Sequence, residues 1–196
     1  MKRGLDICVA ALGLVLLSPL LLASALAIRL TIGAPVLFRQ KRPGLHGRSF
    51  TLVKFRSMRN VSRSEDVDDA QRLTRLGSLL RRTSLDELPE LWNVLIGDMS
   101  LVGPRPLLME YLPLYTPQQA RRHEVRPGLT GWAQINGRNA TSWEQRLALD
   151  TWYVDNQSLA LDLKILAMTV PKVLRAEGVS QPGQSTMAKF RGSGSG

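Results

Sequence analysis

Two adjacent carboxylates, Asp86 and Glu87, are the residues of this chain best suited to covalent chemistry. Pro89 follows them and precedes an apolar run that continues to Leu95, and proline is tolerated only in the first turn of a helix. The spacing therefore predicts a helix that begins near Asp86. A carboxylate at the positive end of a helix is stabilised in its ionised form, so Asp86 would be an anionic nucleophile at neutral pH. For an isolated aspartate, an ordinary helix cap is the alternative.

Three cations are candidates for binding a phosphorylated ligand. Arg105 lies between two prolines that keep its backbone extended, and its planar guanidinium suits bidentate contact with phosphate oxygens. Lys54 and Arg56 alternate with Phe55 in a predicted strand, so both would point to the face opposite Phe55. Of these two, Lys54 is the stronger candidate for contacts with a diphosphate.

The composition limits the class of protein. The chain has 196 residues, enough for one domain with a core, and a net charge of +10, which predicts anionic partners. Nucleic acid is one such partner, but the Lys and Arg residues are spread along the chain, not gathered on one recognition helix. The single cysteine, Cys8, excludes an intramolecular disulfide, and no Cys/His set has the spacing of a metal site.

The segment 7–28 contains no charged residue and would form a helix about 33 Å long, close to the thickness of a bilayer core. Ser18 and Pro19 lie near its middle, where proline breaks a helix and serine can bond to an upstream carbonyl. Basic residues flank both ends: Lys2 and Arg3 before the run, and Arg29, Arg39, Lys41, Arg42 and Arg48 after it. Because such flanks stay in the cytoplasm, we expect a re-entrant helix that enters and leaves on one side. A kinked spanning helix and a signal peptide are the alternatives.

The remaining pattern predicts an α+β fold that is mostly helical. A turn-rich stretch, 42–49, separates two short strands, and 60–69 is a polar loop. Predicted helices cover 71–82 (basic and amphipathic, packed on the membrane surface or on the protein core), 117–122 after a Thr116 cap, 142–154, and 158–176 with an interruption at Pro171. We divide the chain into a membrane helix (1–30), a catalytic domain (31–178) and a tail (179–196) whose final GSGSG is typical of an artificial linker.

Four blocks of sequence, in order, carry a resemblance to a known family. They are KFRSM (54–58), LDELPELWNVLIGDMSLVGPRP (85–106), RPGLTGWAQINGR (126–138) and SWEQRLALDTWYV (142–154). Together they resemble the bacterial sugar transferases called monotopic phosphoglycosyl transferases, over residues 2 to about 174. Members of that family have a Ser-Pro break in a re-entrant helix, which supports the membrane interpretation given above.

The resemblance implies a reaction. Family members transfer a sugar phosphate from a nucleotide sugar to a polyprenol phosphate through a covalent aspartyl–phosphosugar intermediate, with the aspartate of the Asp-Glu pair as nucleophile. It implies that Asp86 is the nucleophile and that Glu87 is either an Mg²⁺ ligand or a base. Two adjacent carboxylates repel, so one of their pKa values should rise unless a cation lies between them. Arg138 and Asp150 match the family and are expected to line the same pocket, with Asp150 holding either the metal or a basic residue.

We therefore expect an enzyme of the inner-membrane cytoplasmic face. The expected substrates are a UDP-sugar and undecaprenyl phosphate, with Mg²⁺ as cofactor and an anionic phospholipid bilayer as the support. An N-acetylated amino sugar is the expected donor, because the chain resembles compact family members; a glucose or galactose transferase is the alternative. A basic protein that binds a membrane surface or nucleic acid is the alternative of another class, but such a protein has no need of paired carboxylates.

Overall fold

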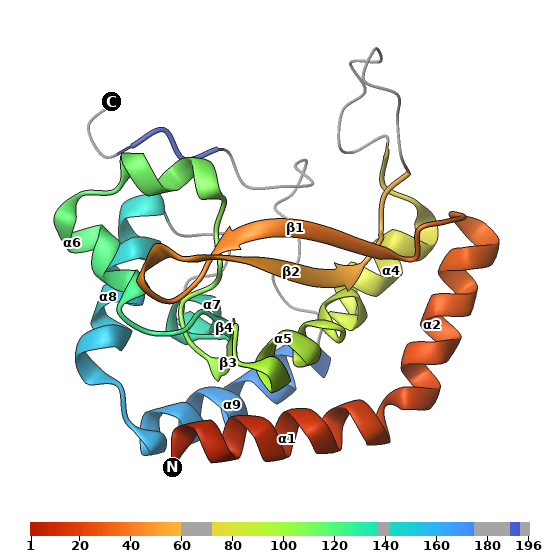
Figure 1. Ribbon diagram of the computed structural model, residues 1–196, viewed down its shortest axis with the longest axis horizontal. Helices are drawn as coiled ribbons and strands as arrows, with labels where there is room; N and C mark the ends of the chain where they lie inside the picture. Colours follow the sequence, from red (N-terminus) through yellow and green to blue (C-terminus); the bar gives the residue numbers. More distant parts are fainter. Residues whose placement is uncertain (60–71, 137–141, 175–188, 193–196) are drawn as a thin grey trace.

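The computed structural model describes residues 1–59, 72–136, 142–174 and 189–192. The described chain is mostly helical, with one β-hairpin and one short parallel strand pair, so the predicted α+β class is confirmed (Figure 1). In chain order the α-helices and strands are α1 (Lys2–Leu16), α2 (Ser18–Thr31), β1 (Leu37–Pro43), β2 (Ser49–Phe55), α4 (Arg75–Arg82), α5 (Glu90–Ile96), β3 (Ser100–Val102), α6 (Pro117–Ala120), β4 (Gly128–Thr130), α7 (Trp132–Asn136), α8 (Trp143–Asn156) and α9 (Leu159–Leu174). Short 3₁₀ helices are η1 (Leu45–Gly47), η2 (Leu85–Glu87), η3 (Met109–Leu114) and η4 (Arg121–His123).

The predicted hairpin is confirmed. Strands β1 and β2 pair antiparallel, from Leu37 opposite Phe55 to Pro43 opposite Ser49, and η1 makes the turn. Gly47 in that turn has a φ of 72°, a left-handed conformation that glycine adopts without strain. Residues directly opposite each other share a face of the sheet, so one face presents Phe38, Gln40 and Arg42 beside Lys54, Leu52 and Phe50.

The parallel pair of β3 and β4 was not predicted from the sequence. Each strand has three residues, too few for a recognisable alternation of apolar and polar side chains. The two backbones approach closely at Gly103 and Gly128, where a Cβ on Gly128 would lie 2.0 Å from the Gly103 nitrogen. Only glycine fits there, and the pair joins residues far apart in the chain at the centre of the molecule.

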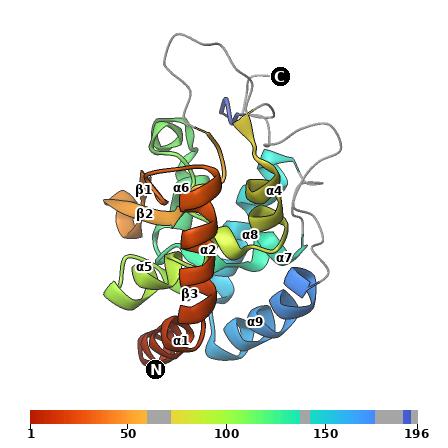
Figure 2. The ribbon, with the colours of Figure 1, turned by 90° about the vertical axis from the view of Figure 1, so that its right-hand side faces the viewer.

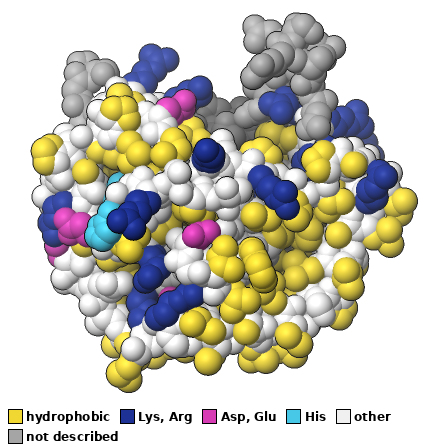
Figure 3. Space-filling view, viewed as in Figure 1, with side chains coloured by type: hydrophobic (Ala, Val, Ile, Leu, Met, Phe, Trp, Pro, Cys, Tyr) yellow, Lys and Arg dark blue, Asp and Glu magenta, His cyan; other side chains and the backbone are white. Residues whose placement is uncertain are grey.

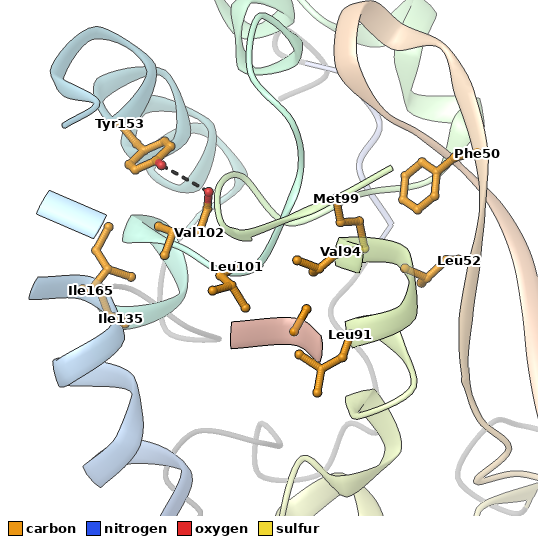
Figure 4. Close-up of a cluster of buried hydrophobic side chains, with 11 residues drawn as sticks. Phe50, Leu52, Leu91, Val94, Met99, Leu101, Val102, Ile135, Tyr153 and Ile165 are labelled. Atoms are coloured by element: carbon orange, nitrogen blue, oxygen red, sulfur yellow. Dashed lines mark hydrogen bonds between the residues drawn. The ribbon is translucent and has the colours of Figure 1, made fainter. Parts of the chain in front are cut away.

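A hydrophobic core surrounds these short strands (Figure 4). Leu91 and Val94 of α5, Leu101 and Val102 of β3, and Ile165 of α9 point into one cluster, together with Phe50 and Leu52 of the hairpin. The Tyr153 hydroxyl of α8 donates a hydrogen bond of 3.2 Å to the Val102 carbonyl. The core therefore joins α5, which follows Glu87 in sequence, to the hairpin that carries Lys54.

Helices α1 and α2 form a bent pair, with an angle of 61° between them (Figures 1 and 2). The Ser18 hydroxyl donates to the Val15 carbonyl at 2.7 Å, which confirms the predicted back-bond at the break. Within the described ranges, no single helix is long and apolar enough to cross a membrane, and only this pair together meets the criteria of length and composition. Hydrophobic side chains gather over α1 and α2 at the bottom and right of Figure 3. The exposed ones on these helices are Ile7, Val9, Leu12, Val15, Leu16, Leu20, Leu22, Leu26 and Leu30.

The first turns of α1 are attached to the rest of the protein by polar contacts. Lys2 forms an ion pair with Asp162 of α9, and Arg3 donates to the carbonyls of Val94 and Leu95 at the end of α5. The buried carboxylate of Asp6 accepts from the Ser100 hydroxyl at 3.1 Å and from a β3 amide at 3.0 Å. These contacts fix the start of the bent pair on the domain that contains the candidate site.

Two sequence predictions need correction or comment. Helix α9 runs through Pro171 without the expected interruption, because a proline so near the end of a helix removes little hydrogen bonding. The predicted loop at 60–69 lies outside the described residues.

Phe190, in the part of the chain assigned to the tail, is buried against the rings of Tyr111, Tyr115 and Trp143.

Candidate active site

Asp86 and Glu87 lie in the 3₁₀ turn η2, immediately before α5. The sequence predicted that the α-helix itself begins near Asp86, but it begins at Glu90, with Pro89 as its N-cap. The reason is local: Ser84 adopts a left-handed backbone (φ 56°) and the chain tightens into a 3₁₀ turn whose hydrogen bonds lead into α5. The two carboxylates therefore stand one turn ahead of the helix.

The Asp86 side chain is buried, and burial raises its pKa. The charge of Glu87 raises this pKa further, while Lys54, Arg105 and Arg81 oppose the shift. A position at a helix start was expected to favour the ionised form of Asp86, whereas burial in this short turn shifts its pKa in the opposite direction. The prediction that one member of the pair has a raised pKa is confirmed, and Asp86 is that member.

Glu87 forms an ion pair with Arg105. Burial by itself would raise the pKa of Glu87, but the charge and hydrogen bond of Arg105, together with Lys54 and Arg81, hold it below its usual value. The Glu87 charge in turn raises the pKa of Arg105, so the guanidinium is always protonated. Side-chain exposures of 21% for Glu87 and 38% for Arg105 leave both groups accessible to a ligand.

A third carboxylate, Glu90, is present in the site and was missed in the sequence analysis. Burial, and then the charge of Glu87, raise the pKa of Glu90 to about 8, so it is mostly protonated at pH 7. The spacing gave a signal that could have identified it, since residues three apart on a helical turn lie on one face. Glu87 and Glu90 have that spacing.

Lys54 and Arg56 have different surroundings. Burial lowers the pKa of Lys54, and Arg105 adds to this, while the charges of Asp86, Glu87 and Glu90 oppose it, so the amine lies among the carboxylates. Arg56 lies beyond the end of β2, where its guanidinium donates to the carbonyls of Ile32, Gly33 and Ala34 after α2. The structure thus places Lys54 with the acidic group and Arg56 on the backbone that ends the bent helix pair.

The hairpin and α5 are held together by a buried amide. The Asn93 side chain accepts from the Val53 amide at 3.1 Å and donates to the Thr51 carbonyl at 2.8 Å. Asn93 is one helical turn after Glu90, and Val53 immediately precedes Lys54 in β2. This contact fixes the position of α5, which carries Glu90, relative to β2, which carries Lys54.

Asp150 of α8 binds a basic residue and not the carboxylate pair. Both Nε and Nη2 of Arg122 donate to its Oδ2, at 3.1 and 2.7 Å, and both side chains are fully buried. Of the two partners left open for Asp150 by the sequence, the structure shows the basic one. Arg122 was not identified from the sequence, where nothing distinguishes it from its neighbours Arg121 and Arg126. Arg138 lies outside the described residues.

A cavity of about 470 Å³ opens beside these groups. The hairpin face described above forms one wall, and α8, Arg105 and the chain that follows it form another. Among the residues that line it, eight are Lys or Arg and one, Glu90, is a carboxylate: the cations are Arg42, Lys54, Arg56, Arg72, Arg81, Arg105, Arg146 and Lys189. A cavity of this charge suits a ligand with several negative charges.

Asp86 and Glu87 can contribute ligands to a magnesium site. Among the described residues, no group of three or more His, Cys, Asp or Glu side chains forms a complete set of metal ligands. Mg²⁺ commonly uses one or two protein carboxylates, with waters and substrate phosphates as its other ligands. The oxygens of Asp86 and Glu87 suit that ion, and the repulsion that raises the pKa of Asp86 would be relieved by a cation beside it.

Comparison with known proteins identifies the family. The family model described as bacterial sugar transferase matches residues 1–176. The chain belongs to this family. The match includes every candidate site residue, so the family resemblance predicted from four sequence blocks is confirmed.

Relatives of this bacterial sugar transferase include compact and longer proteins. It is 58% identical to the sugar transferase EpsL of Bacillus subtilis, over 99% of this chain and 97% of that protein. It is 47% identical to a UDP-glucose:undecaprenyl-phosphate glucose-1-phosphate transferase of Caulobacter vibrioides, over 90% of this chain and 70% of the relative. It is 41% identical to a UDP-N-acetylgalactosamine-undecaprenyl-phosphate N-acetylgalactosaminephosphotransferase of Aeromonas hydrophila, over 90% of this chain and 44% of the relative.

Proposed function

We propose that this protein is a phosphoglycosyl transferase that moves a sugar 1-phosphate from a UDP-sugar to undecaprenyl phosphate and releases UMP. The observation that carries the proposal is the position of Asp86 and Glu87 beside Lys54 and Arg105, next to a cavity whose charged lining residues are eight cations and Glu90. Relatives with 41% to 47% identity are named for reactions of this type. A protein that only binds membranes or nucleic acid would not need buried carboxylates beside such a cavity.

The first step is attack by Asp86 on the phosphorus that carries the sugar. A bond forms between a carboxylate oxygen and phosphorus, and the bond from phosphorus to the bridging oxygen breaks. UMP leaves with that oxygen and its electron pair. Lys54 and Arg105 oppose the rise in the pKa of Asp86 and lie where they can neutralise phosphate oxygens, which is the main requirement of phosphoryl transfer.

The second step releases the enzyme. An oxygen of undecaprenyl phosphate attacks the same phosphorus, and the bond from phosphorus to Asp86 breaks to restore the carboxylate. The products are undecaprenyl diphosphate sugar and free enzyme. Covalent catalysis of this kind suits a soluble donor and a membrane-bound acceptor, because the two need not be bound together.

Glu87 is assigned to positioning and not to proton transfer. Its pKa is held low by the ion pair with Arg105, so it is a weak base at neutral pH. We propose that Asp86 and Glu87 hold Mg²⁺, which when bound would neutralise charge on the phosphate oxygens. Glu87 also fixes the guanidinium of Arg105 at the edge of the cavity.

The bent pair α1–α2 is proposed to enter and leave the inner membrane from its cytoplasmic face. The exposed apolar side chains of these helices suit lipid, and the basic residues at both ends suit the cytoplasmic side. Arg56 ties the end of α2 to the strand that carries Lys54, so the membrane segment is joined directly to the site. The acceptor can then approach from the bilayer and the donor from the cytoplasm.

The donor is proposed to be a UDP-hexose or a UDP-N-acetylhexosamine. The N-acetylated amino sugar expected from the sequence matches the name of one relative, whereas the relatives named for glucose have identities of 42% to 47%. Four of these five relatives are named for glucose, so UDP-glucose is the second candidate donor.

The test is UMP release by the purified protein with undecaprenyl phosphate, Mg²⁺ and a panel of UDP-sugars. We expect release that depends on the acceptor for multiple turnovers and that stops on addition of EDTA. A preference for UDP-N-acetyl sugars over UDP-glucose would favour the amino sugar, and the reverse would favour the hexose. If no UDP-sugar in the panel yields UMP, the proposed function is wrong.

A further inference from the structure

The cavity extends well beyond the carboxylates. Lys54 interacts electrostatically with Asp86, Glu87 and Glu90, whereas Arg146 interacts with Asp150 and Arg122. The charge of Arg105 affects both Lys54 and Arg146, and all three residues line the cavity. The second end, which we call the α8 end, is formed by Arg42, Tyr111, Trp143 and Arg146, and all four line the cavity.

The α8 end combines aromatic rings with guanidinium groups. Trp143 and Arg146 lie three residues apart on α8 and so on one face of the helix, with the guanidinium carbon 5.6 Å from the indole centroid. The ring of Tyr111 meets Trp143 edge-on, with centroids 5.7 Å apart and an interplanar angle of 79°. Ser142 caps the helix, and its hydroxyl accepts from the Gln145 amide, so the first turn that carries Trp143 is well defined.

Each cation of this end has a carboxylate in its surroundings, Glu90 for Arg42 and Asp150 for Arg146, but the charge of Arg105 acts against both of them. Arg42 donates to the Gln40 side chain at 2.6 Å and weakly to the Pro106 carbonyl at 3.4 Å, and its buried Nε has no hydrogen-bond partner among the described residues. Burial and the nearby charge of Arg105 lower the pKa of Arg42 and lower that of Arg146 to about 10. The positive charges at this end repel one another, and a bound anion would relieve that repulsion.

The proposed reaction indicates which anion binds at the α8 end. In a phosphoryl transfer the attacking and leaving oxygens lie roughly in line, on opposite sides of phosphorus. Asp86 attacks from the carboxylate end, so the leaving nucleotide must extend away from Asp86. The cavity continues to the α8 end, where an aromatic ring can stack on a base and guanidinium groups can bind a phosphate.

We propose that the α8 end is the nucleotide subsite, in which Trp143 stacks on the uracil ring while Arg42 and Arg146 bind the phosphate that leaves in UMP. This inference rests on the proposed function, since it takes a UDP-sugar as the donor. It adds three binding residues to the site. Trp143 lines this cavity, whereas Trp132 and Trp152 do not and stack on each other with centroids 4.8 Å apart.

The test measures binding of UMP and of ribose 5-phosphate to the full-length protein by calorimetry, so that no turnover is needed. Trp143→Leu should weaken UMP binding about tenfold and leave ribose 5-phosphate nearly unchanged, because only the stacking is lost. Arg146→Gln should weaken both about tenfold, because a phosphate contact is lost. Matched controls are Trp152→Leu on the same helix and Arg121→Gln, which pairs with Asp155 at the surface. Both controls should bind UMP as the native protein does.

Two results would overturn the inference. The first is UMP binding within twofold of native in both Trp143→Leu and Arg146→Gln, with melting temperatures that show folded proteins. If the native protein still releases UMP from a UDP-sugar, that result means that the nucleotide binds elsewhere and that the proposed function stands. The second is a native protein that neither binds UMP nor releases it from any UDP-sugar, in which case the proposed function fails together with the subsite. Recovery of UMP affinity in Trp143→Phe would support stacking over simple filling of space.

Discussion

The Asp150 carboxylate and the Arg122 guanidinium form an ion pair with side-chain exposures of only 2% and 1%. The same Nη2 of Arg122 that lies 2.7 Å from Asp150 also donates to the Arg105 carbonyl at 2.7 Å. The guanidinium of Arg105 in turn pairs with Glu87. Through these contacts, helix α8 sets the position of Arg105, the partner of Glu87.

Replacing Asp150 by Asn should destabilise the protein by about 3–5 kcal/mol, because it leaves the Arg122 charge buried without its partner. The double variant Asp150→Leu with Arg122→Met should cost less than the sum of the single changes, measured by urea unfolding. Arg121→Gln is the control, since its pair with Asp155 is exposed and should contribute little. Additive single and double effects would mean that the pair does not act as a unit.

The same pair should affect how Arg105 binds the donor. Arg122→Lys keeps a positive charge beside Asp150 but cannot make the same set of directed contacts. We expect its KM for the UDP-sugar to rise several-fold with a smaller change in kcat, because the binding group moves and the nucleophile does not. Equal losses in kcat and kcat/KM would place the effect in the transition state and contradict this assignment.

Asp86→Asn should lower turnover by on the order of 10³-fold or more, because an amide cannot form the acyl phosphate. Its Tm should not fall at pH 8, since the pKa of Asp86 is raised in the folded protein and the neutral amide avoids burial of a charge. Intact-mass analysis with UDP-sugar, in the absence of acceptor, should show a sugar-phosphate adduct on the native protein and none on the variant. An adduct on Asp86→Asn would assign the nucleophile to another residue.

Glu90 should make stability depend on pH. Its pKa is raised from 4.5 to about 8 in the folded protein, so its contribution is fully present below pH 4.5 and is lost as the pH rises through 8. Glu90→Gln should therefore gain stability relative to native between pH 5 and 9, by on the order of 1 kcal/mol or more, equivalent to about 2–4 °C in Tm. The scans are made in EDTA so that no cation compensates the carboxylates. A difference that shrinks with rising pH would contradict the shift.

The topology of α1 and α2 can be tested with single cysteines in a Cys8→Ser background. Gly4→Cys is suitable for the first helix, because a Cβ there meets nothing within 4 Å, and Arg39→Cys, at an exposed position, probes the chain after α2. In intact cells both should be protected from a membrane-impermeant thiol reagent and labelled after lysis. Labelling of one position before lysis would show a spanning segment. Pro19→Ala should shift the pair towards spanning, since it restores the bond to the Val15 carbonyl.

The sequence alone was sufficient to predict those structural features that depend on residues close together in the chain. The hairpin follows from two strand patterns and a turn, and the predicted cap at Thr116 is present, with a side chain that accepts from the amide three residues on. The back-bond of Ser18 beside Pro19 was predicted for the same reason. The Thr116 cap and the Ser18 back-bond each join residues three positions apart, and the two hairpin strands are separated only by a short turn, so these patterns are visible in the chain.

Only the tertiary structure decided how the site is charged. The sequence could say that one of two neighbouring carboxylates has a raised pKa, but not which, because the answer depends on Arg105, 18 residues away from Glu87. Arg105 is fixed in turn by Arg122 and Asp150, from two further elements. Likewise, Arg56 and Lys54 are equivalent in the strand pattern, and only packing directs one to the backbone after α2 and the other to the carboxylates. Electrostatic interactions act across space regardless of sequence separation, so the charge state of Asp86 is a property of the fold.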